Sequence, residues 1–135
     1  MSRYMMLITH GESLRTEDVP QGLLDEMGQS VSENMKKGVL IDTNGLRPTS
    51  EAVRVRQSRR KITVTDGPFA EAKEVVGGYA LIEARSKQEA IDLATKFMEL
   101  HLKHWPEFEG TCEVRAIDGA ESAAQASPAA SSAGG

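Results

Sequence analysis

The chain has 135 residues, a formal net charge of -4 and a hydrophobic content of 39%. This length allows one domain with a buried core and is too short for two ordinary domains. No apolar run approaches the roughly 20 residues of a membrane-spanning helix, and the N-terminus lacks the features of a secretory signal. We therefore expect a cytoplasmic protein with no membrane partner, and its acidic balance disfavours nucleic acid as a partner.

The composition of the C-terminal stretch limits the folded domain, and the single cysteine limits its covalent cross-links. Residues 119–135 are mostly Ala, Ser and Gly and contain no large apolar side chain, so they cannot bury enough surface to offset their ordering entropy. We predict a folded domain over residues 1–118 and a disordered tail over residues 119–135. Cys112 is alone, which excludes an internal disulfide, and its strand-like surroundings are typical of a small apolar core residue.

The apolar pattern predicts two helices and six strands. Residues 3–9 form the first strand, and residues 78–84 form a later one; both carry apolar side chains on their two faces. A helix is predicted over residues 23–37, ended by Gly38. A second helix begins at the capping box Ser86-x-x-Glu89. The other predicted strands are 39–42, 53–56, 61–65 and 111–117, of which 53–56 and 61–65 form a hairpin.

Without the hairpin, the order is β-α-β-β-α-β, which predicts an α+β fold with both helices on one face of an antiparallel sheet. The apolar residues on the opposite face of strands 3–9 and 78–84 then need a partner. A second copy of the chain is the simplest one, so we expect a homodimer. In the alternative, the hairpin or residues 105–108 fold over that face.

The stretch from Asp66 to Glu74 joins the hairpin to the next strand. Gly67 is free to adopt unusual dihedral angles and Pro68 lacks a backbone donor, so the preceding strand must end at Asp66. The stretch also concentrates ionisable groups, and its candidate site residues are Asp66, Gly67, Pro68, Phe69, Glu71, Lys73 and Glu74. These residues predict either a small polar site or a turn with solvated neighbours.

In this topology the strand that ends at His10 lies beside the strand that the Asp66 loop enters. One hypothesis is that His10 acts as a base oriented by Asp66, while Arg47 or Lys73 holds an anionic group of a small-molecule substrate. A histidine with a pKa near 6.5 suits proton abstraction at neutral pH. The alternative is a solvated histidine at a strand end and an aspartate that caps its own turn.

Other patterns are weaker. His101-x-x-His104 places two imidazoles on nearby helix positions, but no further ligand stands at a suitable spacing, so we expect no metal. The absence of a nucleotide-binding glycine pattern favours a protein without a cofactor. The basic residues of the hairpin lack interleaved aromatic residues and are typical of a solvated face; they are Arg54, Arg56, Arg59, Arg60 and Lys61.

Six motifs in chain order carry a resemblance to a known family: residues 4–8 (YMMLI), 45–49 (GLRPT), 53–56 (VRVR), 64–74 (VTDGPFAEAKE), 77–82 (GGYALI) and 113–115 (EVR). The chain resembles the YCII-related proteins of the type named after the Asp-Gly-Pro-Phe motif. The resemblance implies a ferredoxin-like monomer that dimerises into an α/β barrel. It implies no settled activity.

The wider YCII family is thought to use a histidine of the first helix together with an aspartate. That helix register falls on Met27 here, so this role is not carried over, and the acid of this type is Asp66. One hypothesis is therefore a cofactor-independent isomerase or lyase that acts on a small anionic molecule and uses acid/base chemistry at the Asp66 loop. The alternative is a non-catalytic ligand-binding or regulatory module, because similar proteins are often encoded near extracytoplasmic-function sigma factors.

Overall fold

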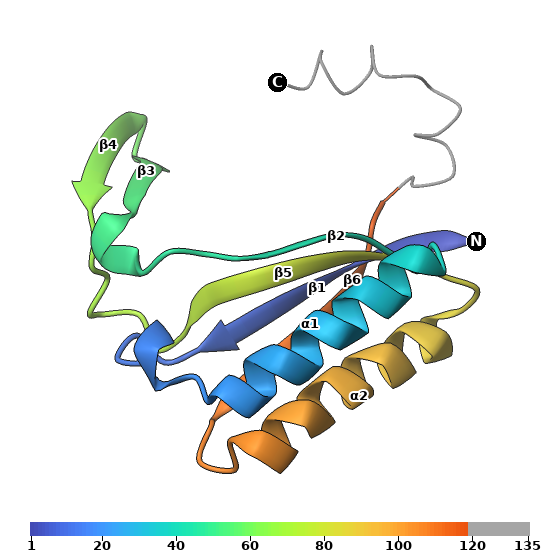
Figure 1. Ribbon diagram of the computed structural model, residues 1–135. Coiled ribbons are helices and arrows are strands. Elements are labelled where there is room, and N and C mark those ends of the chain that lie inside the picture. Colours follow the sequence, from blue (N-terminus) through green and yellow to red (C-terminus); the bar gives the residue numbers. More distant parts are fainter. Residues whose placement is uncertain (119–135) are drawn as a thin grey trace.

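The computed structural model describes residues 1–118, and the tail over residues 119–135, for which we predicted disorder, lies outside the described residues. The described chain forms a four-stranded antiparallel sheet, two helices on one face of this sheet, and a separate two-stranded hairpin (Figure 1). This is the ferredoxin-like β-α-β-β-α-β arrangement with an inserted hairpin, so the predicted α+β fold is confirmed.

The sheet has the strand order β2-β5-β1-β6, with all pairs antiparallel. Its strands are β2 (Leu40–Gly45), β5 (Val75–Ala84), β1 (Ser2–His10) and β6 (Gly110–Ala116). The hairpin consists of β3 (Val53–Ser58) and β4 (Lys61–Asp66). The helices are α1 (Gln21–Lys36) and α2 (Lys87–His104), and two short 3-10 helices span Thr16–Asp18 and Thr49–Glu51.

The helix ends follow local rules. The Ser86 hydroxyl accepts a hydrogen bond from the Glu89 backbone N–H at 3.1 Å, and the Glu89 carboxylate accepts one from the Arg85 backbone N–H at 3.1 Å. This geometry confirms the predicted capping box. Gly38 follows α1 with a φ of 75°, a value at which glycine is favoured. Among the described residues, no helix is long and apolar enough to cross a membrane.

The core lies between the sheet and α2. Tyr4, Met6 and Ile82 point toward the helices and are buried, and Ala90 and Ala94 of α2 pack against them. Small alanines on the helix allow it to approach the larger side chains of the sheet closely. Burial of each large apolar side chain contributes about 1.5 to 3 kcal/mol, so this contact fixes the position of α2.

The opposite face of the sheet is apolar at its centre. Met5 pairs with Leu81, and Leu7 pairs with Tyr79, so these four side chains lie together on the face without helices. The segment after α2 does not cover them, because Phe108 packs on the helix side with its ring 4.8 Å from that of His101. The hairpin stands apart from the sheet (Figure 1). The alternative in which either segment covers this face is therefore wrong for the described residues.

The hairpin is attached through its base. The Gly67 backbone N–H donates to the Ala52 carbonyl at 2.8 Å, and the Arg54 guanidinium lies 3.8 Å from the centre of the Phe69 ring. Farther out, the register places four β-branched side chains on one face, with exposed fractions of 54%, 68%, 63% and 67% for Val53, Val55, Ile62 and Val64. The hairpin therefore presents an apolar face that nothing in the described chain covers.

Candidate functional site

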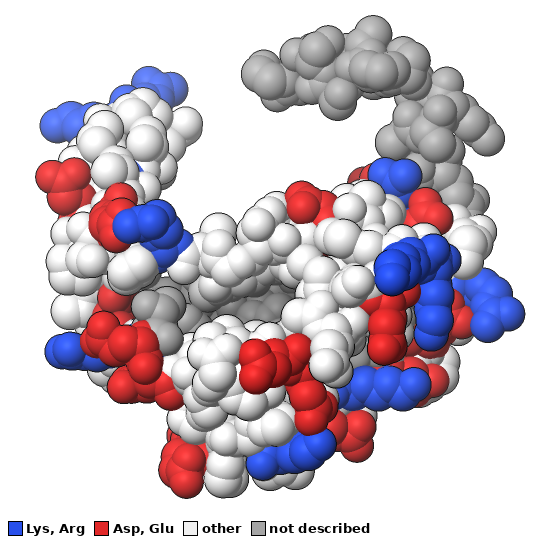
Figure 2. Space-filling view, in the orientation of Figure 1, with Lys and Arg blue, Asp and Glu red and all other residues white. Residues whose placement is uncertain are grey.

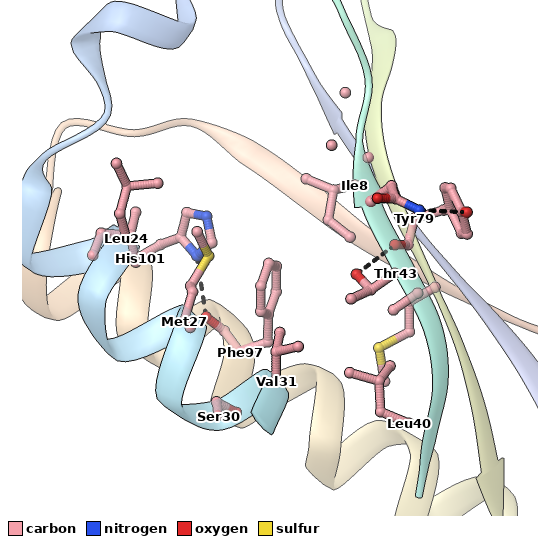
Figure 3. Close-up of a pocket in the computed structure, with 18 of the residues that line it drawn as sticks. Ile8, Leu24, Met27, Ser30, Val31, Leu40, Thr43, Tyr79, Phe97 and His101 are labelled. Carbon is pink, nitrogen blue, oxygen red and sulfur yellow. Dashed lines mark hydrogen bonds between the residues drawn. The ribbon is translucent and has the colours of Figure 1, made fainter. Parts of the chain in front are cut away.

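A cavity of about 570 Å³ lies between the helices and the helix-facing side of the sheet (Figure 3). Most of the side chains that line it are apolar, among them Leu24, Met27 and Val31 of α1 and Ile8 and Leu40 of the sheet. No Asp, Glu, Lys or Arg lines it. In Figure 2 the charged side chains stand around a hollow whose own surface is uncharged. The volume and the apolar lining are typical of a small-molecule site.

The sequence of α1 keeps this cavity open. Gly28 lines it, and a Cβ added there would meet no atom within 4 Å, so a side chain is missing where space is available. Met27 lines the cavity as well. It occupies the register at which the resemblance places a histidine in the wider family, so α1 contributes an apolar side chain to the cavity at this position.

Two histidine rings also line the cavity, and each has its Nδ1 bonded to a backbone carbonyl. His10 Nδ1 lies 2.7 Å from the Gly11 oxygen, and His101 Nδ1 lies 3.1 Å from the Phe97 oxygen. Because a carbonyl can only accept, each Nδ1 carries the hydrogen, and the lone pair of each neutral ring is on Nε2. Burial lowers the pKa of His101 below its ordinary value, so this ring is neutral at pH 7.

The position of His10 depends on a glycine of β5. His10, at the end of β1, pairs with Val75 at the start of β5. This pairing confirms the prediction that the two strand ends lie side by side. Gly77 lies at a bulge, and a Cβ there would be 2.5 Å from His10 Cδ2 and closer still to Nε2. The His10 ring therefore lies over Gly77, and a larger residue at position 77 would displace it.

His10 also lines a second cavity, of about 550 Å³. Lys73 and Glu74 of the predicted site line it together with His10. Its other charged residues are the acids Asp18, Glu107 and Glu109. Four carboxylates and one ammonium give this cavity a negative potential, which disfavours the anionic substrate that the sequence suggested.

Asp66 and Arg47 line neither cavity. Asp66 is the last residue of β4, its side chain is exposed, and it lines neither cavity. Among the described residues, the structure records no hydrogen bond between Asp66 and His10. Arg47 donates to Glu51 at 2.8 Å, which raises the pKa of the guanidinium, and its side chain is 82% exposed. His10 therefore lines a cavity together with Lys73 and Glu74, whereas Asp66 and Arg47 line neither cavity.

The remaining loop residues hold the base of the hairpin. A Cβ at Gly67 would lie 2.9 Å from the Thr49 carbonyl carbon and closer still to its oxygen, so glycine is required for this close approach. Phe69 is 6% exposed, and Glu71 pairs with Arg54 at 2.8 Å. The peptide bond before Pro68 is cis. Neither cavity is lined by Gly67, Pro68, Phe69 or Glu71.

Comparison with known proteins identifies the family of this chain. The YCII-related domain matches residues 2–98, which is most of the described chain. The chain belongs to the YCII-related family. It is also 31% identical over 94 residues to "Uncharacterized protein R00369" of Rhizobium meliloti (strain 1021), and the match covers 67% of this chain and 76% of that protein.

Two residues of this YCII-related chain have roles that sequence reasoning did not assign. The sequence presented His101 only as one of two imidazoles without a further metal ligand, yet its ring lines the cavity; the aromatic residues spaced around it were the available signal. Glu12, two residues after His10, accepts a hydrogen bond from the Thr49 hydroxyl through Oε1, while its Oε2 is buried without a partner. No sequence signal identified Glu12, because its burial depends on the distant Thr49 segment.

Two weaker candidates have structural roles. His104 Nε2 lies 2.9 Å from Glu26, and hydrogen bonds from Lys103 and His104 lower the pKa of this carboxyl.

Within residues 1–118, no group of three or more His, Cys, Asp or Glu is placed to hold a metal ion. Burial raises the pKa of the Cys112 thiol to about 11, so the thiol is protonated at neutral pH and is a poor nucleophile.

Proposed function

We propose that this YCII-related protein binds a small uncharged molecule in the cavity of about 570 Å³ and transfers a proton on it, as a cofactor-independent isomerase or lyase. The observation that carries the proposal is a lining that contains two histidines and no charged side chain. An ionised ligand would lose its hydration there without gaining a counter-charge, which costs several kcal/mol. The proposed substrate is therefore uncharged, in place of the anionic one expected from the sequence.

His10 is the proposed base. Its Nδ1–H donates to the Gly11 carbonyl, which fixes the ring orientation and leaves the Nε2 lone pair free to accept a proton. This carbonyl takes the orienting role that the sequence hypothesis gave to Asp66. Return of the proton to another atom of the same ligand is an isomerisation, and its delivery to a departing group is an elimination. Neither reaction requires a metal or a cofactor.

Hydrogen–deuterium exchange on a neutral ketone tests this proposal. The probe is 2-tetralone in D₂O, and its carbon-bound hydrogens next to the carbonyl are followed by proton NMR. We expect the protein to accelerate exchange over buffer, and His10→Ala to remove the acceleration, because general base catalysis contributes about 10²- to 10⁴-fold. Arg47→Ala is the matched control and should exchange at the wild-type rate.

Two results contradict the proposal. An exchange rate equal to that of buffer, in the presence of saturating protein, would exclude proton transfer and leave a ligand-binding module. Equal rates for wild type and His10→Ala would show that another group is the base.

We also propose that two copies associate through the sheet face that carries Met5, Leu7, Tyr79 and Leu81. What supports this is the apolar centre of that face, together with the uncovered apolar face of the hairpin. Surfaces of this kind favour association, because each large side chain that is buried contributes about 1.5 to 3 kcal/mol. A two-fold axis would place the same face of both copies in contact.

Light scattering coupled to size exclusion tests the association. We expect twice the chain mass of 14.6 kDa for the wild type and a single chain for Leu81→Lys. Leu102→Lys is the control, because Leu102 is 69% exposed on α2, away from the sheet face. A single chain for the wild type at every concentration would refute the homodimer.

A further inference from the structure

His101 is the one buried polar side chain of the described residues, with 7% of its surface exposed. Its Nδ1–H donates to the Phe97 carbonyl, so its Nε2 is a hydrogen-bond acceptor. No protein group among the described residues bonds this Nε2. The ring lies on the lining of the cavity, between α1 and the strands (Figure 3).

The surroundings of His101 are aromatic. The centre of the Phe97 ring lies 4.8 Å away with an interplanar angle of 63°, and the Phe108 ring lies at the same distance. Trp105 packs on Phe108 at 5.1 Å, and all four rings line the cavity. These contacts hold the imidazole in place and favour an aromatic ligand, because ring pairs at such distances attract one another beyond simple burial.

A ligand that fills the cavity displaces water from around Nε2, so this acceptor loses the hydrogen bond that water can donate to it. A ligand that carries an O–H group restores that bond, whereas an ether or an ester offers only acceptors and leaves Nε2 unpaired. A carboxylate or phenolate finds no cation in the lining. The cavity therefore distinguishes ligands by whether they have a hydrogen to donate.

We propose that His101 Nε2 is the acceptor that selects neutral hydroxylated aromatic compounds, with simple phenols as the ligand class. This inference rests on the proposed function only in taking the cavity as the ligand site, and it is independent of proton transfer by His10. Burial lowers the pKa of His101, which keeps the acceptor available at neutral pH. A cavity of about 570 Å³ is large enough for one or two such rings.

A matched ligand pair tests the proposal. The probes are 4-ethylphenol and 4-ethylanisole, which differ only by the replacement of O–H by O–CH₃. Dissociation constants are measured by NMR titration, and the ¹⁵N resonances of the imidazoles are recorded in the same samples. We expect the phenol to bind the wild type about tenfold more tightly than the ether, and to shift the His101 Nε2 resonance as a new hydrogen bond requires.

Two variants complete the design. His101→Phe keeps a ring of similar shape and removes the acceptor, so it should bind the phenol and the ether equally. His104→Phe is the control, because the same substitution three residues later changes a ring that lies outside the cavity lining. It should preserve the tenfold preference.

The outcomes separate this inference from the proposed function. If neither probe binds the wild type, the cavity is not a ligand site and both proposals fail. If both bind equally and the His101 resonance does not move, the acceptor role fails, while proton transfer by His10 on a neutral ketone still stands.

Discussion

Gly77→Ala is expected to displace the His10 ring while leaving the fold intact. The added Cβ would lie 2.5 Å from His10 Cδ2, whereas ordinary contact begins at 3.4 Å. The ring must therefore move by roughly 1 Å, which breaks its 2.7 Å hydrogen bond to the Gly11 carbonyl. Loss of that bond costs about 1 kcal/mol of unfolding free energy. Misplacement of a catalytic group by this distance reduces turnover by about 10²-fold.

The assay combines urea denaturation with the deuterium exchange of 2-tetralone. The result expected for Gly77→Ala is a small loss of stability and a large loss of exchange, together with a changed ¹⁵N signature of the His10 ring. Gly45→Ala is the control, since its Cβ would meet only the Gly77 oxygen, at 4.0 Å. If Gly77→Ala catalysed deuterium exchange at the wild-type rate, catalysis would not depend on the position of the His10 ring, and the proposed role of His10 would be refuted.

Three further predictions concern stability. Arg54→Ala should lower the free energy of unfolding by about 1 kcal/mol, because Arg54 covers Phe69 and pairs with Glu71; Arg56→Ala, on the same strand face, should change the urea midpoint little. Gly28→Ala should raise stability by about 0.5 to 1 kcal/mol in the same assay, since α1 gains a better helix former in open space. Burial lowers the pKa of His101 in the folded state, so the unfolded state binds more protons than the folded state below about pH 6.5. The free energy of unfolding of the wild type should therefore fall relative to that of His101→Phe as the pH falls, by at most about 1.4 kcal/mol per pH unit.

Much of the fold could be predicted from the chain because local signals and the global pattern agree. The capping box at Ser86 fixed one helix start, and the alternating residues on both sides of the turn at residues 59–60 identified the hairpin. Element bounds were less accurate where no such signal exists. β2 was expected over residues 39–42 and extends over Leu40–Gly45, because its pairing with β5 continues through polar residues.

The site was less predictable, because it depends on contacts between distant segments. The position of His10 beside β5 followed from topology. That Asp66 lines neither cavity did not, because Asp66 ends β4 of the hairpin, which stands apart from the sheet (Figure 1). The cavity is lined by Gly28 and Met27 of α1 together with residues of α2 and the sheet, which are distant in the sequence. No local pattern reports such a space, and the aromatic group around His101 resembles ordinary core packing in the sequence.

The most direct test of the account is an NMR titration of methyl resonances with 2-tetralone. We expect the methyl groups of Ile8, Leu24 and Val31, which line the cavity between helices and sheet, to shift with a single dissociation constant. The methyl groups of Val55 and Val64 on the hairpin should not move. Shifts confined to the hairpin and the Asp66 loop, with unchanged cavity methyls, would contradict the assignment of the ligand site.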